Sequence, residues 1–439
     1  MTSGTEQGWI GTAAPVAGPG SFAKQRAGQD PLGRRLANGC YLLAIVAINF
    51  TLFRPSPVDV LFVIALALSV SSRQIVTRNM FIFLTLIAVW VFGLFVSSVS
   101  LVSNPEVSYY LLKISFAVSI GVCSCLVAAH WDAADLRRFL QVYVLATSAA
   151  ATLGIAGYVL GIEELMWDGR AKGFLDDPNM YGAFLLPGAL ACMYMLSRGE
   201  RRAIYGPALA WIVFGLLVSF SRAAIVSGLL WGLIYYAFLN RRNVARASLY
   251  AGFGIAALLV LVLLSVLFVD GLGERLAERS TIAKDYDLGH GGRYNRYALS
   301  IPFILDNPLG MGLLEWDRFF EEPIHNIWVS SFLNYGWLSG IAFTLLLMFS
   351  VSISAWNFRQ TGNEALLAVS VAWAAVICCA FLHEAERWRH LWLFTGLVWG
   401  LNARHLVVTA GSRGDEPARP AGPEAISIAP QPALIRLRP

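Results

Sequence analysis

The sequence has 439 residues, of which 57% are hydrophobic, 13% aromatic and only 14% charged, and its mean hydropathy is +0.60. This composition excludes an ordinary soluble globular protein and predicts an all-α, polytopic integral membrane protein. The net charge of +5 does not require a nucleic-acid partner, because basic residues in a membrane protein first report its topology. The six cysteines lie in apolar segments without the spacing of zinc ligands, so we expect neither a disulfide framework nor a metal site.

Apolar windows long enough to cross a bilayer predict about twelve transmembrane helices. They lie near residues 38–53, 58–72, 79–99, 109–129, 139–161, 179–197, 203–220, 223–239, 247–269, 337–356, 365–382 and 390–403. The second and the last are short enough to be re-entrant or interfacial. We expect disordered cytoplasmic tails at residues 1–36 and 406–439, which leave a transmembrane domain of residues 37–405.

The distribution of arginine predicts how these helices are oriented, since cytoplasmic connections are enriched in Lys and Arg. If the N-terminus is cytoplasmic, the short basic connections all fall on the cytoplasmic side: Arg73 and Arg78, Arg137 and Arg138, Arg198, Arg201 and Arg202, Arg241, Arg242 and Arg246, and Arg359. Five polar positions then lie outside: Arg54, residues 168–179, Arg222, a large loop of about 270–336 that we expect to carry short helices, and residues 383–390.

A basic residue stands in the short outside turn Ser219-Phe220-Ser221-Arg222. A guanidinium at the bilayer centre costs about 2.5 to 3.5 kcal/mol, so this group must face water, protein or an anionic ligand. Two interpretations follow. Arg222 either extends to the membrane interface, or it is a fixed cation for a lipid-linked phosphate.

The large loop contains a second basic motif that starts at Gly292-Arg293 and includes Arg296. Arg293 and Arg296 are three residues apart, so they share one face if the segment is helical. They could grip a diphosphate through their planar guanidinium groups, or they could simply begin a solvated helix.

A histidine follows at the end of the same loop, in His325-Asn326, directly before an apolar segment. Near neutral pH a histidine can accept a proton from an attacking hydroxyl, which makes His325 a candidate general base. The alternative is a capping or interfacial histidine. Gly336 and Gly340, four residues apart, indicate a close helix contact.

Three other polar groups carry less specific signals. Arg170 and Asn179 bracket an Asp-Asp-Pro-Asn turn that also reads as a helix start. Trp388 and Trp392 suit an interfacial aromatic belt. Acidic residues near His325 could orient it, or could form a solvated loop beside Arg318, and we leave them outside the predicted site: Glu315, Asp317, Glu321 and Glu322.

Together these motifs resemble the O-antigen ligase and polysaccharide polymerase superfamily. Ser219 to Arg222 is similar to its Ser-x-Ser-Arg turn, and Gly292-Arg293 followed by Asn307-Pro308-Leu309-Gly310-Met311-Gly312 is similar to its Gly-Arg and Pro-hydrophobic-Gly-x-Gly elements. His325-Asn326, nine residues and Gly336 resemble its His-Asn-x₉-Gly signature, and Arg170 to Asn179 resembles its Arg-x-x-Gly-Phe and Pro-Asn elements.

The resemblance implies a metal-independent, inverting membrane glycosyltransferase of a bacterial inner membrane that needs no cofactor. It would act at the periplasmic face on an undecaprenyl-diphosphate-linked glycan. We assign Arg222 and Arg293 to the diphosphate and His325 to the acceptor hydroxyl, because the reaction requires stabilisation of the leaving group and deprotonation of the acceptor. Supporting roles are expected for Arg296, Asn326, Arg170 and Asn179.

Three alternative functions stay open. Polymerisation of exopolysaccharide or O-antigen repeat units is our first expectation, with ligation of O-antigen to lipid A-core as the alternative. A flippase for lipid-linked oligosaccharide is a third, disfavoured because the spans contain almost no acidic residues for ion coupling. The donor, a glycan or lipid A-core acceptor and membrane lipids are the expected partners, and polysaccharide export or chain-length-control proteins are candidates.

Overall fold

The computed structural model describes residues 31–50, 56–72, 77–241 and 292–402, together with isolated positions between 243 and 274. The expected span near 247–269, the first part of the large loop and most of both expected tails lie outside these residues. The described part is almost wholly helical, and its one sheet is a two-stranded hairpin of β1 (Met166–Trp167) and β2 (Arg170–Ala171). The all-α prediction is therefore confirmed.

Eleven of the predicted spans coincide with helices. Six helices in the described residues are long and apolar enough to cross a membrane: α4 (Arg78–Ser98), α5 (Pro105–Ala128), α6 (Ala133–Leu160), α7 (Pro178–Ser197), α9 (Arg222–Leu239) and α15 (Gly336–Thr361). Five are shorter: α2 (Pro31–Val46), α3 (Pro57–Ser71), α8 (Arg202–Val218), α16 (Glu364–Ala380) and α17 (Arg389–Gly400). Helix α2 begins inside the expected tail.

Short polar side chains set where several of these helices begin. Asn104, Asp132 and Asp177 precede α5, α6 and α7, and each accepts a hydrogen bond from a backbone N–H in the first turn. Proline occupies the first helical position of α5 and α7, where its missing N–H costs nothing. These caps place polar residues at the ends of apolar helices, where the connecting loops meet water.

Helix α17 lies at the centre of the bundle, and each of its twelve residues is buried. At 1.5 Å per residue it is about 18 Å long, too short for the roughly 30 Å of a hydrocarbon core. It packs against α5, where Gly396 lies so close to the carbonyl of Gly121 that a Cβ atom would overlap with it. The last predicted span is therefore a helix enclosed by protein.

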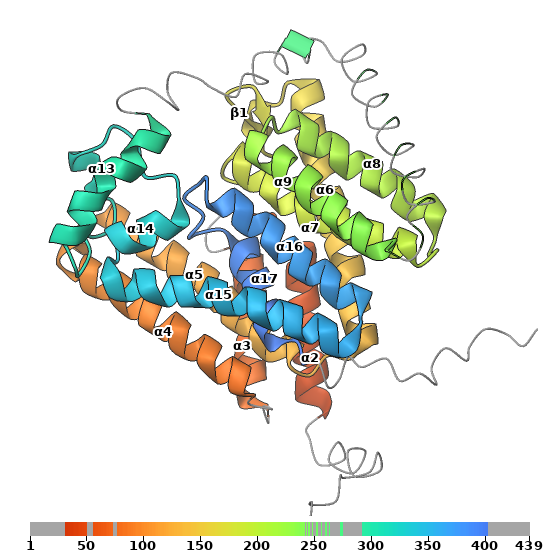
Figure 1. Cartoon of the computed structure of the whole chain (residues 1–439), viewed down its shortest axis with the longest axis horizontal. Coiled ribbons are helices and arrows are strands. Elements are labelled where there is room, and N and C mark those ends of the chain that lie inside the picture. The colour runs from red at the N-terminus through yellow and green to blue at the C-terminus, as the bar shows by residue number, and fades with distance from the viewer. Residues whose placement is uncertain are drawn as a thin grey trace, which may run out of the picture.

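The bundle has two ends with different loops. At one end the basic connections meet: Arg137 pairs with Glu200 at 2.7 Å, and Arg198 lies 3.8 Å from Glu364. At the other end lie the β1–β2 hairpin, the α8–α9 turn, the short helices α13 (Arg293–Asp306) and α14 (Ile327–Leu333), and the α16–α17 loop (Figure 1). We name the second end the loop end. This grouping agrees with the alternation expected from the sequence.

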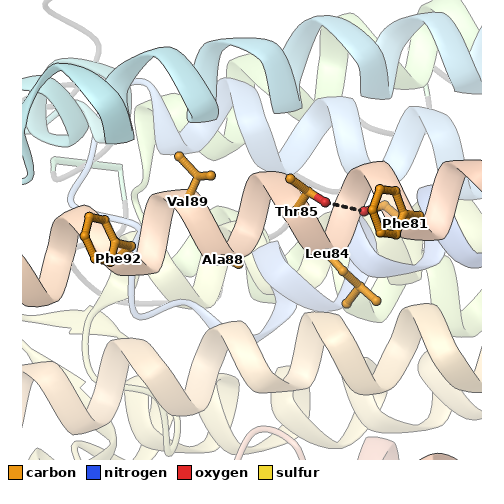
Figure 2. Close-up of a pocket in the computed structure, with 6 residues that line it drawn as sticks. All are labelled: Phe81, Leu84, Thr85, Ala88, Val89 and Phe92. Carbon is orange, nitrogen blue, oxygen red and sulfur yellow. Dashed lines mark hydrogen bonds between the residues drawn. The ribbon is translucent and has the colours of Figure 1, made fainter.

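The outer side of α4 carries a shallow apolar groove (Figure 2). Phe81 and Phe92 stand at its two ends and are 66% and 61% exposed. The hydroxyl of Thr85 donates to the carbonyl of Phe81 at 2.9 Å, so it presents no unused donor. Such a surface suits contact with lipid chains.

Candidate active site

The Ser-x-Ser-Arg motif forms the tight turn between α8 and α9. Phe220 has a φ of 48°, a left-handed conformation that non-glycine residues rarely adopt. Ser219 and Ser221 are completely buried, and the Ser221 N–H donates to the Ser219 hydroxyl at 3.2 Å. A Cβ atom on Gly182 of α7 would lie 3.2 Å from both serines, so only small residues fit. The turn places Arg222, which is half-buried, at the first position of α9.

Arg170 ties this turn to the neighbouring hairpin and to α7. Its Nε donates to the carbonyl of Ser219 at 2.9 Å, and its Nη2 donates to Oδ1 of Asn179 at 2.8 Å. The structure thus brings Arg170 and Asn179 to the turn that carries Arg222. Two hydrogen bonds of Arg170 are used in holding these segments together.

Helix α13 starts at Arg293, so the segment is helical, but its two arginines differ in their surroundings. Arg296 is only 4% exposed and forms an ion pair with Glu322 at 2.7 Å. It also donates to the carbonyl of Pro323 at 3.4 Å. Arg293 is half-buried one turn earlier. Arg296 therefore anchors the segment that leads to His325.

One acidic residue that the sequence analysis left outside the predicted site lies beside His325. Oε2 of Glu322 lies 4.0 Å from Nε2 of His325, and the Arg296 ion pair holds this carboxylate in place. The Arg296 hydrogen bond and the nearby positive charges keep the pKa of Glu322 below its ordinary value. Glu315 pairs instead with the exposed Arg318 at 2.7 Å, as the alternative of a loop beside Arg318 predicts.

His325 lies directly before α14, and its backbone is fixed on both sides. The Tyr297 hydroxyl donates to the His325 carbonyl at 2.8 Å. Asn326 caps α14, since its Oδ1 accepts from the N–H groups of Trp328 and Val329 at 3.0 and 3.1 Å. The imidazole is 24% exposed, and its buried Nδ1 has no hydrogen-bond partner among the described residues. Asn326 is thus a helix cap that sets the position of the neighbouring imidazole.

The surroundings of His325 favour its neutral form. Burial, followed by the positive charge of Arg293, lowers its pKa from the ordinary 6.5 to about 3. The nearby Glu322 carboxylate opposes this shift. Before any ligand binds, His325 is therefore an uncharged imidazole at neutral pH.

The glycines of two motifs meet in a backbone contact between residues 308–312 and residues 334–337, which we name the clasp. Gly336 has a φ of +84°, and a Cβ atom on it would lie 2.6 Å from the Pro308 carbonyl oxygen. The Trp337 N–H donates to the Pro308 carbonyl at 2.9 Å, and the Gly312 N–H donates to the Asn334 carbonyl at 3.0 Å. The close contact predicted for Gly336 is therefore present, although its partner is a loop backbone.

The α16–α17 loop contributes a residue that the sequence analysis did not assign. The His383 ring lies 6.5 Å from the His325 ring, and its Nδ1 is 2.9 Å from the Cys379 carbonyl oxygen. Burial and the charges of Arg293 and Arg170 lower the pKa of His383 to about 4. In the sequence, the feature that could have identified His383 was the cluster of polar residues 383–390 between two apolar spans. His383 is thus affected both by Arg293, at the start of α13, and by Arg170, in the hairpin beside the α8–α9 turn.

The aromatic belt expected in this loop is wrong. Trp388 and Trp392 are each only 1% exposed. The Trp388 ring stacks between His383, with centroids 5.7 Å apart, and His390, at 5.3 Å. Trp388 is buried because the loop folds back into the bundle, and Trp392 is buried because it lies within α17, which protein rather than lipid headgroups surrounds.

The described site therefore joins four segments: the β1–β2 hairpin with the α8–α9 turn, the start of α13, the start of α14, and the α16–α17 loop. Cationic groups surround two neutral imidazoles. Residues 207–344 match the family model described as O-Antigen ligase. This part of the chain is therefore similar to the O-antigen ligase family.

A curated relative extends this comparison. The general O-oligosaccharyltransferase of Acinetobacter baylyi is 26% identical to this chain over 317 residues, which cover 65% of this chain and 53% of the relative. The chain thus spans about half the length of that protein. The O-antigen ligase match contains Arg222, Arg293 and His325, whereas Arg170 and His383 lie outside it. Contacts from beyond the matched region complete the site.

Proposed function

We propose that the protein is a membrane glycosyltransferase that transfers an undecaprenyl-diphosphate-linked glycan to an acceptor hydroxyl at the periplasmic face of a bacterial inner membrane. The observation that carries the proposal is the grouping of Arg293 and His325 beside the segments that hold Arg222, at one end of an apolar bundle. Guanidinium groups suit a diphosphate, and a neutral imidazole suits a hydroxyl proton.

In the proposed reaction, the acceptor oxygen bonds to the anomeric carbon while the bond from that carbon to the diphosphate oxygen breaks. The hydroxyl proton passes to His325, and the electron pair of the broken bond leaves with the diphosphate. Arg222 and Arg293 stabilise the charge that develops on this leaving group. A single displacement of this kind inverts the anomeric configuration. The donor is already activated by its diphosphate, so the step needs no cofactor.

Donor binding makes His325 a stronger base in this scheme. Arg293 is one of the causes that lower the pKa of His325. A diphosphate bound to Arg293 would offset that charge and raise the pKa of the imidazole. The base is therefore weak without donor and gains strength when donor is present. The low pKa of His325 without donor limits protonation of the imidazole in the empty site.

In this proposal, the other predicted residues position the segments that carry Arg222 and His325. Arg170 and Asn179 hold the turn that carries Arg222, and Asn326 caps the helix behind His325. Arg296 holds Glu322 beside the imidazole. Their side chains orient the reacting groups without needing to touch the transferred glycan.

Two acceptors fit the same donor chemistry. Polymerisation of repeat units remains the proposal made from the sequence. Transfer of the glycan to lipid A-core is the second candidate, because the matched family is described as O-Antigen ligase and the relative as an O-oligosaccharyltransferase. The glycans of a deletion strain separate them: single-repeat products indicate polymerase loss, and long unattached polymer indicates ligase loss.

The reaction itself is tested with the purified full chain in nanodiscs and an undecaprenyl-diphosphate-linked oligosaccharide. We expect release of lipid diphosphate and a longer or transferred glycan whose new linkage has the opposite anomeric configuration. His325→Ala should lower the rate about 10² to 10⁴-fold, the usual contribution of a general base. Full activity in His325→Ala would rule out that role, and lipid movement without a new glycosidic bond would indicate a flippase.

A further inference from the structure

A narrow cleft lies beside the site, between α5 and the α16–α17 loop. It is lined by Tyr110 of α5, Trp316 of the large loop, Asn334 after α14, and Glu384, Glu386 and Arg387. We name it the acidic cleft. Its free volume is about 20 Å³, enough for one water-sized group such as a sugar hydroxyl or hydroxymethyl.

The floor of the acidic cleft holds a buried hydrogen-bond chain with one end unused. The Ser330 hydroxyl donates to the Glu386 carboxylate at 2.5 Å, and Nδ2 of Asn334 donates to the same hydroxyl oxygen at 3.0 Å. Asn334 is 5% exposed, and its Oδ1 has no hydrogen-bond partner among the described residues. A buried polar atom left in this way costs free energy, and a bound hydroxyl would satisfy it.

The acids of the cleft suit neutral hydroxyls better than anions. Burial and the neighbouring Glu386 raise the pKa of Glu384 to about 8, so this carboxyl holds a proton at neutral pH. A protonated carboxyl both donates and accepts hydrogen bonds, as a sugar hydroxyl does. Arg387 is the one cation of the cleft, and it donates to the Tyr110 hydroxyl at 2.9 Å and lies near Glu384. A carboxylate on the ligand would meet a site that already disfavours negative charge.

The acidic cleft is connected to the reacting groups by adjacent residues of one loop. His383 lies beside His325, and the next residue, Glu384, lines the cleft. Because Nδ1 of His383 contacts a carbonyl oxygen, which can only accept, Nδ1 carries the proton and Nε2 is an acceptor. The proposed diphosphate side offers arginine donors, whereas this side offers acceptors for hydroxyl protons.

We propose that the acidic cleft is the acceptor subsite and binds an uncharged sugar, one hydroxyl or hydroxymethyl of which reaches Asn334 and Glu384. Tyr110 and Trp316 also line this cleft. This inference rests on the proposed glycosyl transfer. It adds which sugars the enzyme accepts: neutral ones, with uronic acids rejected.

Saturation-transfer NMR tests the subsite without relying on catalysis. The probes are the methyl glycosides of glucose, galactose, mannose and N-acetylglucosamine, with methyl glucuronide as the anionic probe, each added to the full chain in nanodiscs. We expect at least one neutral glycoside to give saturation transfer and methyl glucuronide to give none. Equal transfer to methyl glucuronide, or no transfer to any glycoside, would overturn the proposal.

Two variants and one control locate the binding. Asn334→Leu removes the unused acceptor at similar volume and should weaken neutral glycoside binding about tenfold. Glu384→Gln keeps an uncharged group that donates and accepts hydrogen bonds, as the protonated acid does, so neutral glycosides should still bind and methyl glucuronide should still be rejected. Glu321→Gln, an exposed acid of the same large loop, should behave as wild type. Unchanged binding in Asn334→Leu, with a wild-type melting temperature, contradicts the assignment.

Failure of this inference can be told from failure of the proposed function. Hydrolysis of the donor, in which water replaces the acceptor hydroxyl and lipid diphosphate is released, reports the donor side alone. If Asn334→Leu keeps that release but raises the acceptor KM about tenfold, the acidic cleft serves the acceptor. If wild type releases no lipid diphosphate when donor and acceptor are both present, glycosyl transfer is refuted, while the NMR result still decides whether the cleft binds sugars.

Discussion

Three arginines that look alike in the sequence occupy different environments. Arg222 and Arg293 are half-buried at the first positions of α9 and α13, where backbone N–H groups also point outward. Arg296 is buried and paired with Glu322. Two arginines at first helical positions are therefore placed where an anion could be bound, whereas Arg296, one turn later in α13, holds Glu322 in place.

The first prediction uses this difference. Arg222→Ala and Arg293→Ala should each lower kcat/KM for the lipid-linked donor about 10² to 10³-fold, the usual cost of losing one charge-stabilising group. Their melting temperatures should stay close to wild type, because both side chains are only half-buried. Arg241→Ala, an exposed arginine at the opposite end of α9, is the matched control and should keep full activity. Wild-type rates in both site variants would refute the diphosphate role.

The second prediction concerns pH. A general base must be neutral, so activity is lost as pH falls through its pKa. In the free enzyme the pKa of His325 is about 3, so kcat/KM should stay flat from pH 8 down to about 5. Donor binding offsets Arg293 and raises the pKa, so kcat should begin to fall at a higher pH than kcat/KM. Coincident acid limbs in the two profiles would contradict this coupling between donor and base.

At the scale of elements, two separate motifs turn out to be one contact. The Pro-x-Gly-x-Gly segment and the Gly336 turn bond to each other through their backbones, and both need glycine where no Cβ atom fits. This clasp joins the end of α13 to the junction of α14 and α15. It fixes α14, whose first residues follow His325.

The third prediction tests the clasp. Gly336→Ala should destabilise the protein by about 1 to 3 kcal/mol, because alanine is strained at a φ of +84° and its Cβ would overlap Pro308. Thermal unfolding of the purified protein measures the loss. Gly232→Ala is the control, since nothing lies within 4 Å of a Cβ there and alanine is the better helix former. A Gly336→Ala protein as stable as the control would show that the clasp contributes little.

At the scale of the whole molecule, one buried ion pair ties the loop end to the N-terminal helices. Nη2 of Arg389, at the start of α17, lies 2.6 Å from Oδ1 of Asp59 in α3. Arg389 also donates to the carbonyl of Ile48 at 3.4 Å. The pair anchors the end of the loop that carries His383 and Glu384.

The fourth prediction follows from that anchor. Asp59→Asn keeps the shape but leaves a buried guanidinium without its carboxylate, which should cost about 3 kcal/mol or more in stability. The melting temperature should fall, and activity should fall with it as the α16–α17 loop loosens. Arg318→Ala breaks an exposed pair and should cost less than about 1 kcal/mol. Similar melting temperatures for the two variants would refute the anchoring role.

The sequence by itself determined the helical class, eleven of the spans and the grouping of basic connections, because these follow from local hydrophobic length and charge. It also supplied His325, Arg222 and Arg293 as candidates, since their motifs are local. Only the tertiary structure decided that His383 lies beside His325, that Glu322 belongs with them and that Trp388 is buried. Those contacts join segments far apart in the chain or depend on how a loop folds back, and no local pattern encodes either.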